Sequence, residues 1–163
     1  MHILLATDAD WIVDEVTAAL GGEDVTFAVC REGRAVADEV HRHMPDLAVC
    51  DLQIGSMGAM AVTMALRLDE SAGRLNHVKV LMLLDRAADV HLARRSGAEG
   101  WLVKPLDALR LKLAATAILN DEPYAEGLDV DAPPVEPMVP LPDDATDADA
   151  TDADDEADEP ATT

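Results

Sequence analysis

Aromatic residues and cysteines are scarce in this chain of 163 residues. Phe, Trp and Tyr make up 2% of it, and Cys30 and Cys50 are the only two cysteines. A zinc site would need further ligands at close spacing, so the pair reads instead as two small buried hydrophobes in apolar runs. No apolar run is long enough to span a membrane, and the amino terminus lacks the pattern of a secretory signal. These absences predict a reduced, cytoplasmic protein.

Basic residues are missing from residues 121–163, which hold 16 of the 33 Asp and Glu and none of the 12 Lys and Arg. The formal net charge of -21 therefore describes mostly this segment. Seven of the nine prolines also lie there, followed by a Thr/Asp/Ala repeat. High net charge with few large apolar residues predicts disorder. We therefore expect a folded domain over residues 1–120 and a disordered acidic tail rich in Pro, Asp and Ala over residues 121–163.

The acidic tail has two interpretations. It is either a solubilising, self-repelling segment or an interaction arm for a basic partner surface. Residues 133–142 are apolar and proline-rich enough to bind in an extended conformation. The charge of the tail argues against direct nucleic-acid binding.

Five short apolar runs alternate with amphipathic helical segments in residues 1–120. In the first helical segment Ile12, Val16 and Leu20 share one face, which is the helical spacing. Continuous apolar strands that alternate with helices indicate a parallel sheet covered on both faces. Right-handed crossovers then give a doubly wound α/β fold with five parallel strands and five helices. The expected strands are 2–7, 25–29, 47–50, 78–84 and 100–103, and the expected helices are 11–20, 33–43, 60–68, 88–96 and one that begins at Pro105.

Acidic residues and one lysine follow three of the expected strands. Asp8 and Asp10 follow the first strand, Asp51 the third and Lys104 the fifth. In doubly wound folds the functional crevice lies at the carboxyl ends of the strands, so these side chains should meet. Carboxylates suit Mg²⁺, lysine can neutralise phosphoryl oxygens, and an aspartate can become an acyl phosphate. Each residue alone would suit a solvated turn, but their joint placement favours a phosphoryl-transfer site.

Two motifs resemble the receiver domain of two-component response regulators. They are residues 45–52 (PDLAVCDL) and residues 96–105 (SGAEGWLVKP). The resemblance covers about residues 1–119. It implies a flavodoxin-like sheet with strand order 2-1-3-4-5, a cis-proline at Pro105, and a signalling protein that is not an enzyme.

The resemblance also implies a role for each matching residue of the site. Asp51 would accept a phosphoryl group from a histidine kinase, and Lys104 would contact the phosphoryl oxygens. Mg²⁺ would be held by Asp8, Asp51 and the backbone carbonyl of Gln53. Trp101 occupies the aromatic switch position, where the ring turns inward on activation.

The first turn departs from the family pattern. The family usually has two acids in succession after the first strand, whereas here the pair is Thr7-Asp8. A threonine hydroxyl is uncharged, so one Mg²⁺ ligand is missing, and Mg²⁺ binding is expected to be weak or absent. Asp10 would reach the site only by an unusual path and is expected to cap the first helix.

The fourth strand departs from the pattern as well. The family has Ser or Thr at its end, to couple the phosphoryl group to the aromatic switch. Here the position falls on Leu84, or on Met82 if the strand is aligned without a gap, and neither can donate a hydrogen bond. Asp51 and Lys104 then form either a phosphorylation site or a structural ion pair. Trp101 is either a switch or a core residue.

Two functions follow from these observations. The first is a single-domain response regulator of phosphorelay signalling, with a degenerate phosphorylation site, that acts through protein–protein binding. The alternative is a constitutive receiver-derived accessory subunit docked on a larger complex. The chain resembles stand-alone actinobacterial receivers encoded near the proton-pumping NADH–quinone oxidoreductase, which suggests that membrane-associated respiratory complex as the host. The expected partner is accordingly a histidine kinase or a larger protein complex.

Overall fold

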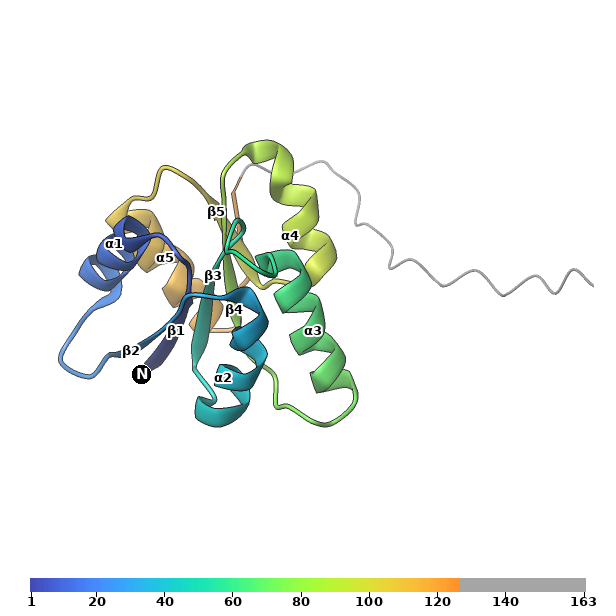
Figure 1. The fold of residues 1–163 in the computed structure, drawn as a ribbon. Helices are drawn as coiled ribbons and strands as arrows, with labels where there is room; N and C mark the ends of the chain where they lie inside the picture. Colours follow the sequence, from blue (N-terminus) through green and yellow to red (C-terminus); the bar gives the residue numbers. More distant parts are fainter. Residues whose placement is uncertain (127–163) are drawn as a thin grey trace, which may run out of the picture. The chain divides into compact units, whose positions relative to one another are not determined.

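The computed structural model describes residues 1–126, which form a parallel sheet between two layers of helices (Figure 1). The predicted tail lies outside the described residues from residue 127 on. Helices α1 and α5 cover one face of the sheet, and α2, α3 and α4 cover the other (Figure 1). The strands are β1 (His2–Ala6), β2 (Thr26–Cys30), β3 (Leu47–Asp51), β4 (Val80–Leu84), β5 (Gly100–Val103) and β6 (Tyr124–Ala125). The helices are α1 (Asp10–Leu20), α2 (Val36–His43), α3 (Ala59–Ser71), α4 (Val90–Ser96) and α5 (Ala108–Leu119), with short 3-10 turns η1 (Gly33–Ala35) and η2 (Ala87–Asp89) before α2 and α4.

The sheet has six parallel strands in the order β2-β1-β3-β4-β5-β6, so the prediction of five strands was one short. The predicted order of the first five is confirmed. The additional strand, β6, pairs with β5 after α5 has crossed back over the sheet. It was missed because two residues cannot show the alternating pattern by which a strand is recognised. Residues 121–126 are therefore part of the folded body.

Alternation along the strands divides the core into two halves, because successive side chains of a strand point to opposite faces. Strands β3 and β4 are buried along their whole length. Both cysteines are buried, as predicted, and burial raises the pKa of the Cys50 thiol to about 12. The half under α2, α3 and α4 contains Leu4, Ala6, Ala48, Cys50, Met82 and Leu84. The half under α1 and α5 contains Ile3, Leu5, Leu47, Val49, Leu81 and Leu83.

The starts of α5 and α1 differ from the predictions in the residue that caps each helix. Helix α5 begins at Ala108 and not at Pro105, which follows a cis peptide bond after Lys104. Its N-cap is Asp107, whose side chain accepts hydrogen bonds from the backbone N–H groups of the next turn at 2.9 and 3.1 Å. Asp10 does not cap α1, because Ala9 occupies the N-cap position without a side-chain hydrogen bond. Asp10 is instead the first helical residue and forms an ion pair with Arg31 at 2.6 Å.

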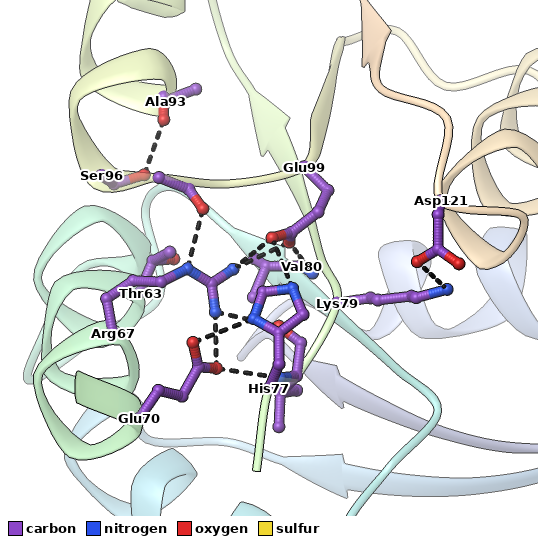
Figure 2. Close-up of polar contacts among 12 residues, drawn as sticks. Thr63, Arg67, Glu70, His77, Lys79, Val80, Ala93, Ser96, Glu99 and Asp121 are labelled. Atoms are coloured by element: carbon purple, nitrogen blue, oxygen red, sulfur yellow. Dashed lines mark hydrogen bonds and ion pairs between the residues drawn. The ribbon is translucent and has the colours of Figure 1, made fainter. Parts of the chain in front are cut away.

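A charged network ties α3 to the amino-terminal ends of β4 and β5 (Figure 2). Arg67 of α3 donates to both carboxylate oxygens of Glu99 at 2.8 Å and to Glu70 at 2.7 Å. The same guanidinium donates to the backbone carbonyls of Gly97 and Val78. His77 lies between the two glutamates, at 3.0 and 3.1 Å. Each of these partly buried charges therefore has a partner, which a buried charge requires.

The helices formed by residues 1–126 are all too short or too polar to cross a membrane.

Candidate functional site

The carboxyl ends of three strands bring Thr7, Asp51 and Lys104 together. Asp51 is the last residue of β3, while Thr7 and Lys104 directly follow β1 and β5. Lys104 Nζ lies 2.6 Å from Asp51 Oδ1, and the Thr7 hydroxyl donates to Asp51 Oδ2 at 3.1 Å. The backbone N–H of Gln53 also donates to Asp51 Oδ1, at 3.3 Å. Asp51 is only 3% exposed, so its carboxylate depends on these donors for the solvation that it has lost.

Lys104 is held by two carboxylates. Its Nζ lies 3.0 Å from Asp85 Oδ1 as well as 2.6 Å from Asp51, and its side chain is 11% exposed. Burial alone would lower the pKa of Lys104, but the hydrogen bonds with Asp51 and Asp85 outweigh it and raise the pKa above the ordinary lysine value. The ammonium also lies 5.7 Å from the centre of the Trp11 ring, within the range of a cation–π interaction. The ammonium is therefore charged at neutral pH and already surrounded by partners.

Two residues of this site, Asp85 and Trp11, were not predicted from the sequence. Asp85 directly follows β4, so the strand-end rule that found Asp51 and Lys104 would have found it too. The family pattern drew attention instead to the missing hydroxyl one residue earlier. Trp11 belongs to the first turn of α1, and its contact with Lys104 depends on how that helix is oriented. No sequence pattern gave that orientation.

Asp8 lies beside the loop that follows β3. One of its carboxylate oxygens accepts a hydrogen bond from the backbone N–H of Gly55 at 3.3 Å. Among residues 1–126 no group of three or more His, Cys, Asp or Glu side chains is arranged to hold a metal ion. A Mg²⁺ site would therefore rest on Asp8, Asp51 and a backbone carbonyl such as that of Gln53. One or two carboxylates completed by water are the usual protein ligands of Mg²⁺, so this donor set fits the ion.

The two residues that were predicted to form a switch, Leu84 and Trp101, are both buried in the apolar core. Leu84 is the last residue of β4, lies opposite Val103 of β5 and is fully buried. Met82, the other candidate for this position, lies two residues before the strand end, opposite Trp101. The strand end therefore falls on Leu84, which offers no hydroxyl. Trp101 is 6% exposed and packs in the core half under α2, α3 and α4.

The indole of Trp101 has a hydrogen-bond partner in the segment that follows α5. Its Nε1–H donates to the backbone carbonyl of Glu126 at 2.8 Å. The carboxylate of Glu126 accepts a hydrogen bond from the backbone N–H of Val103 at 3.1 Å and forms an ion pair with Arg110. These contacts were not predicted, because residues 121–126 are acidic and contain a proline, like the predicted tail to which they were assigned.

Known proteins with similar sequences are response regulators. Residues 3–116 match the model of the response regulator receiver domain family. The transcriptional regulatory protein CseB of Streptomyces avermitilis is 27% identical over 128 residues, which are 77% of this chain and 52% of CseB. The polar-differentiation response regulator DivK of Brucella ovis is 29% identical over 93 residues, which are 56% of this chain and 73% of DivK. The chain thus spans about half the length of the CseB proteins that it matches.

Solved structures show the same fold. The chemotaxis response regulator CheY4 of Vibrio cholerae gives a TM-score of 0.60 at 22% identity, covering 72% of this chain and 97% of CheY4. The receiver domain of NtrX from Brucella abortus gives 0.62 at 21% identity, covering 72% of this chain and 98% of the NtrX domain. The family match extends over most of the folded body, and Asp51 and Lys104 meet at its strand ends. The chain therefore belongs to the response regulator receiver domain family of two-component signalling.

Proposed function

We propose that this chain is a receiver with a degenerate phosphorylation site that acts by binding a partner protein, largely independently of phosphorylation. The observation that carries the proposal is the contact of Lys104 with both Asp51 and Asp85. The family resemblance implies that this lysine contacts the phosphoryl oxygens. Here the carboxylate of Asp85 already lies against Lys104 Nζ, and the Trp11 ring lies within the range of a cation–π interaction.

Charge argues against efficient phosphorylation of Asp51. A phosphoryl group carries roughly two negative charges at neutral pH. The incoming group would meet the carboxylate of Asp85 beside the ammonium of Lys104. Thr7 supplies a neutral hydroxyl where the family has a carboxylate, so it adds no Mg²⁺ affinity to offset that repulsion. Phosphorylation is therefore expected to be slow, and Mg²⁺ binding weak.

Coupling between the site and the partner surface is also interrupted. A modification shifts an equilibrium only through interactions that differ between two states. The methyl groups of Leu84 cannot form a hydrogen bond with a phosphoryl oxygen. Phosphorylation of Asp51 would therefore not move a hydroxyl at this position, and Trp101 would not respond to such a movement. A constitutive accessory subunit of a larger complex is the second candidate function, and the buried Leu84 favours it. The two candidates differ in whether any phosphorylated form exists.

Labelling with a small phosphodonor tests the proposal. Wild-type protein is incubated with acetyl phosphate and Mg²⁺, and incorporation of one phosphoryl group is followed by intact-mass spectrometry. We expect little incorporation in wild type and a clear gain in the variant Thr7→Asp, Leu84→Thr, Asp85→Ala, which restores the family residues at two positions and removes the competing carboxylate. The matched control adds Asp51→Asn to that variant and should abolish the gain. Wild-type labelling as fast as that of the restored variant would refute the degenerate site.

Partner retention gives a second, independent measurement. Tagged wild type and Asp51→Asn are purified from native lysate, and the retained proteins are compared. The asparagine side chain keeps the shape of the aspartate but cannot form the acyl phosphate, so we expect the same partners in similar amounts. Loss of every partner in Asp51→Asn, with the fold intact, would instead support a phosphorylation-controlled regulator.

A further inference from the structure

The segment of residues 121–126, called the strap below, runs along the free edge of β5. Within it, Tyr124 pairs with Gly100 and Ala125 with Trp101 in a parallel ladder. The backbone N–H of Tyr124 donates to the carbonyl of Glu99 at 3.2 Å. This close approach requires glycine at position 100, because a Cβ there would lie 2.6 Å from the Tyr124 carbonyl oxygen. The strap is therefore fitted to β5 and does not merely pass over it.

Ion pairs anchor the strap at both ends. At its start, Lys79 Nζ lies 2.9 Å from Asp121 (Figure 2). The same ammonium donates to the carbonyl of Leu119 at 2.6 Å. At its end, the Glu126 carboxylate pairs with Arg110 of α5 and accepts the N–H of Val103. Lys79 and Arg110 lie at opposite ends of β5, so the two pairs hold the strap along the length of the strand.

The end of the strap also supplies the acceptor for Trp101. A buried indole N–H usually requires a hydrogen-bond partner, and the carbonyl of Glu126 provides it at 2.8 Å. The carbonyl and carboxylate of the same residue thus bind Trp101 on one side and Arg110 on the other. Charge-assisted bonds such as those between a guanidinium and a carboxylate are stronger than neutral ones, so the ion pair fixes where the carbonyl lies.

We propose that Glu126 is a positioning residue that keeps Trp101 in its inward position through the strap, without any signal from Asp51. The inference rests on the proposed function, because it names what holds the aromatic switch residue when Leu84 cannot. It implies that the surface formed by α4, β5 and α5 has one fixed shape, closed by the chain's own carboxyl-terminal segment. Release of Glu126, and not phosphorylation, is then what would free Trp101.

Tryptophan fluorescence tests this in the full-length chain. A Trp11→Phe background leaves Trp101 as the only tryptophan and removes the half-exposed indole of residue 11. In this background, Glu126→Ala should shift the Trp101 emission to the red and raise its acrylamide quenching constant severalfold. The quenching constant of Glu126→Gln should lie between those of the Trp11→Phe background and Glu126→Ala. The amide oxygen of Gln can still accept a hydrogen bond from the Val103 N–H, but it forms no ion pair with Arg110.

Glu122→Ala is the matched control. It removes a carboxylate from the same segment, and the Glu122 side chain is exposed and makes no hydrogen bond or ion pair within residues 1–126. Far-UV circular dichroism establishes that each variant is folded. Quenching of both Glu126 variants equal to that of Glu122→Ala would overturn the proposal. The fluorescence experiment contains no phosphodonor, so equal quenching in these variants would not affect the acetyl phosphate labelling result. Conversely, if wild type is labelled efficiently while its Trp101 emission stays unchanged, the proposed function alone is refuted.

Discussion

Removing the ammonium of Lys104 should destabilise the domain more than removing the charge of Asp51. Lys104→Met keeps a similar chain length but leaves two carboxylates without their cation. Asp51, at 3% exposure, would retain only the Thr7 hydroxyl and the Gln53 N–H as donors. Asp51→Asn instead leaves Lys104 paired with Asp85 at 3.0 Å. The two substitutions differ in cost because Asp85 provides a second carboxylate for Lys104.

The magnitudes can be worked from these contacts. Breaking a buried pair so that one charge is stranded costs about 3–5 kcal/mol. Asp85 is partly solvated and Asp51 keeps two donors, so we expect the lower end, about 3 kcal/mol, for Lys104→Met. Asp51→Asn weakens one hydrogen bond without stranding a charge, which costs about 1 kcal/mol. For a domain of this size the melting temperature should fall by about 10 °C and about 3 °C respectively.

Urea unfolding followed by circular dichroism at pH 7 without Mg²⁺ measures both changes. Since the pKa of Lys104 is raised, its contribution to stability is complete at pH 7 and is lost only as the pH rises through that raised pKa. Lys112→Met, which removes an exposed ammonium from α5, is the control and should be nearly neutral. An equal or larger loss in Asp51→Asn would refute the shared ion-pair arrangement.

Three further predictions concern the first turn and the strap. Thr7→Asp should tighten Mg²⁺ binding in calorimetric titration by about tenfold, equivalent to about 1.4 kcal/mol; unchanged affinity would place residue 7 outside the metal site. Burial alone would raise the pKa of Glu126, but the bonds of its carboxylate to a guanidinium and a backbone N–H lower the pKa overall. The carboxylate therefore stabilises the fold fully above the ordinary glutamate pKa, and this contribution is lost as the pH falls through the lowered pKa. The Trp101 emission should therefore shift to the red in acid, and persistence of the inward signal at a pH where the domain is folded and Glu126 protonated would contradict this. Gly100→Val should displace the strap and destabilise the domain by about 1–3 kcal/mol through overpacking; wild-type stability and quenching would show that the close approach to Tyr124 is unimportant.

Burial explains which strands could be predicted from the sequence. Strands β3 and β4 are apolar along their length because both faces are covered, and their predicted bounds agree with the structure to within two residues. The two-residue β6 has no such pattern, since its pairing depends on Gly100 of another strand. Local composition therefore identified the centre of the sheet but not its last edge.

The site could be predicted where topology alone determines proximity. Asp51 and Lys104 lie at the carboxyl ends of strands in a parallel sheet, and those ends share one edge of the sheet. Their proximity could therefore be predicted from the order of the strands alone. The contact of Trp11 with Lys104 depends on the rotation of α1 about its axis, which the sequence leaves open. Asp10 was predicted to cap α1 because aspartate is favoured at that position. The prediction was wrong because the turn before α1 is one residue shorter than expected, and Ala9 occupies the N-cap position.

The network around Arg67 bears on how such a domain can diverge. It lies at the amino-terminal ends of β4 and β5, whereas Asp51, Asp85 and Lys104 lie at the carboxyl-terminal ends. Its charges are neutralised among α3, Glu99 and His77, without a contribution from Asp51, Asp85 or Lys104. Substitutions at the carboxyl-terminal edge therefore leave this attachment of α3 intact. The attachment of α3 and the residues at the carboxyl-terminal edge are therefore two separate sets of contacts, and a change in one does not remove an ion-pair partner from the other.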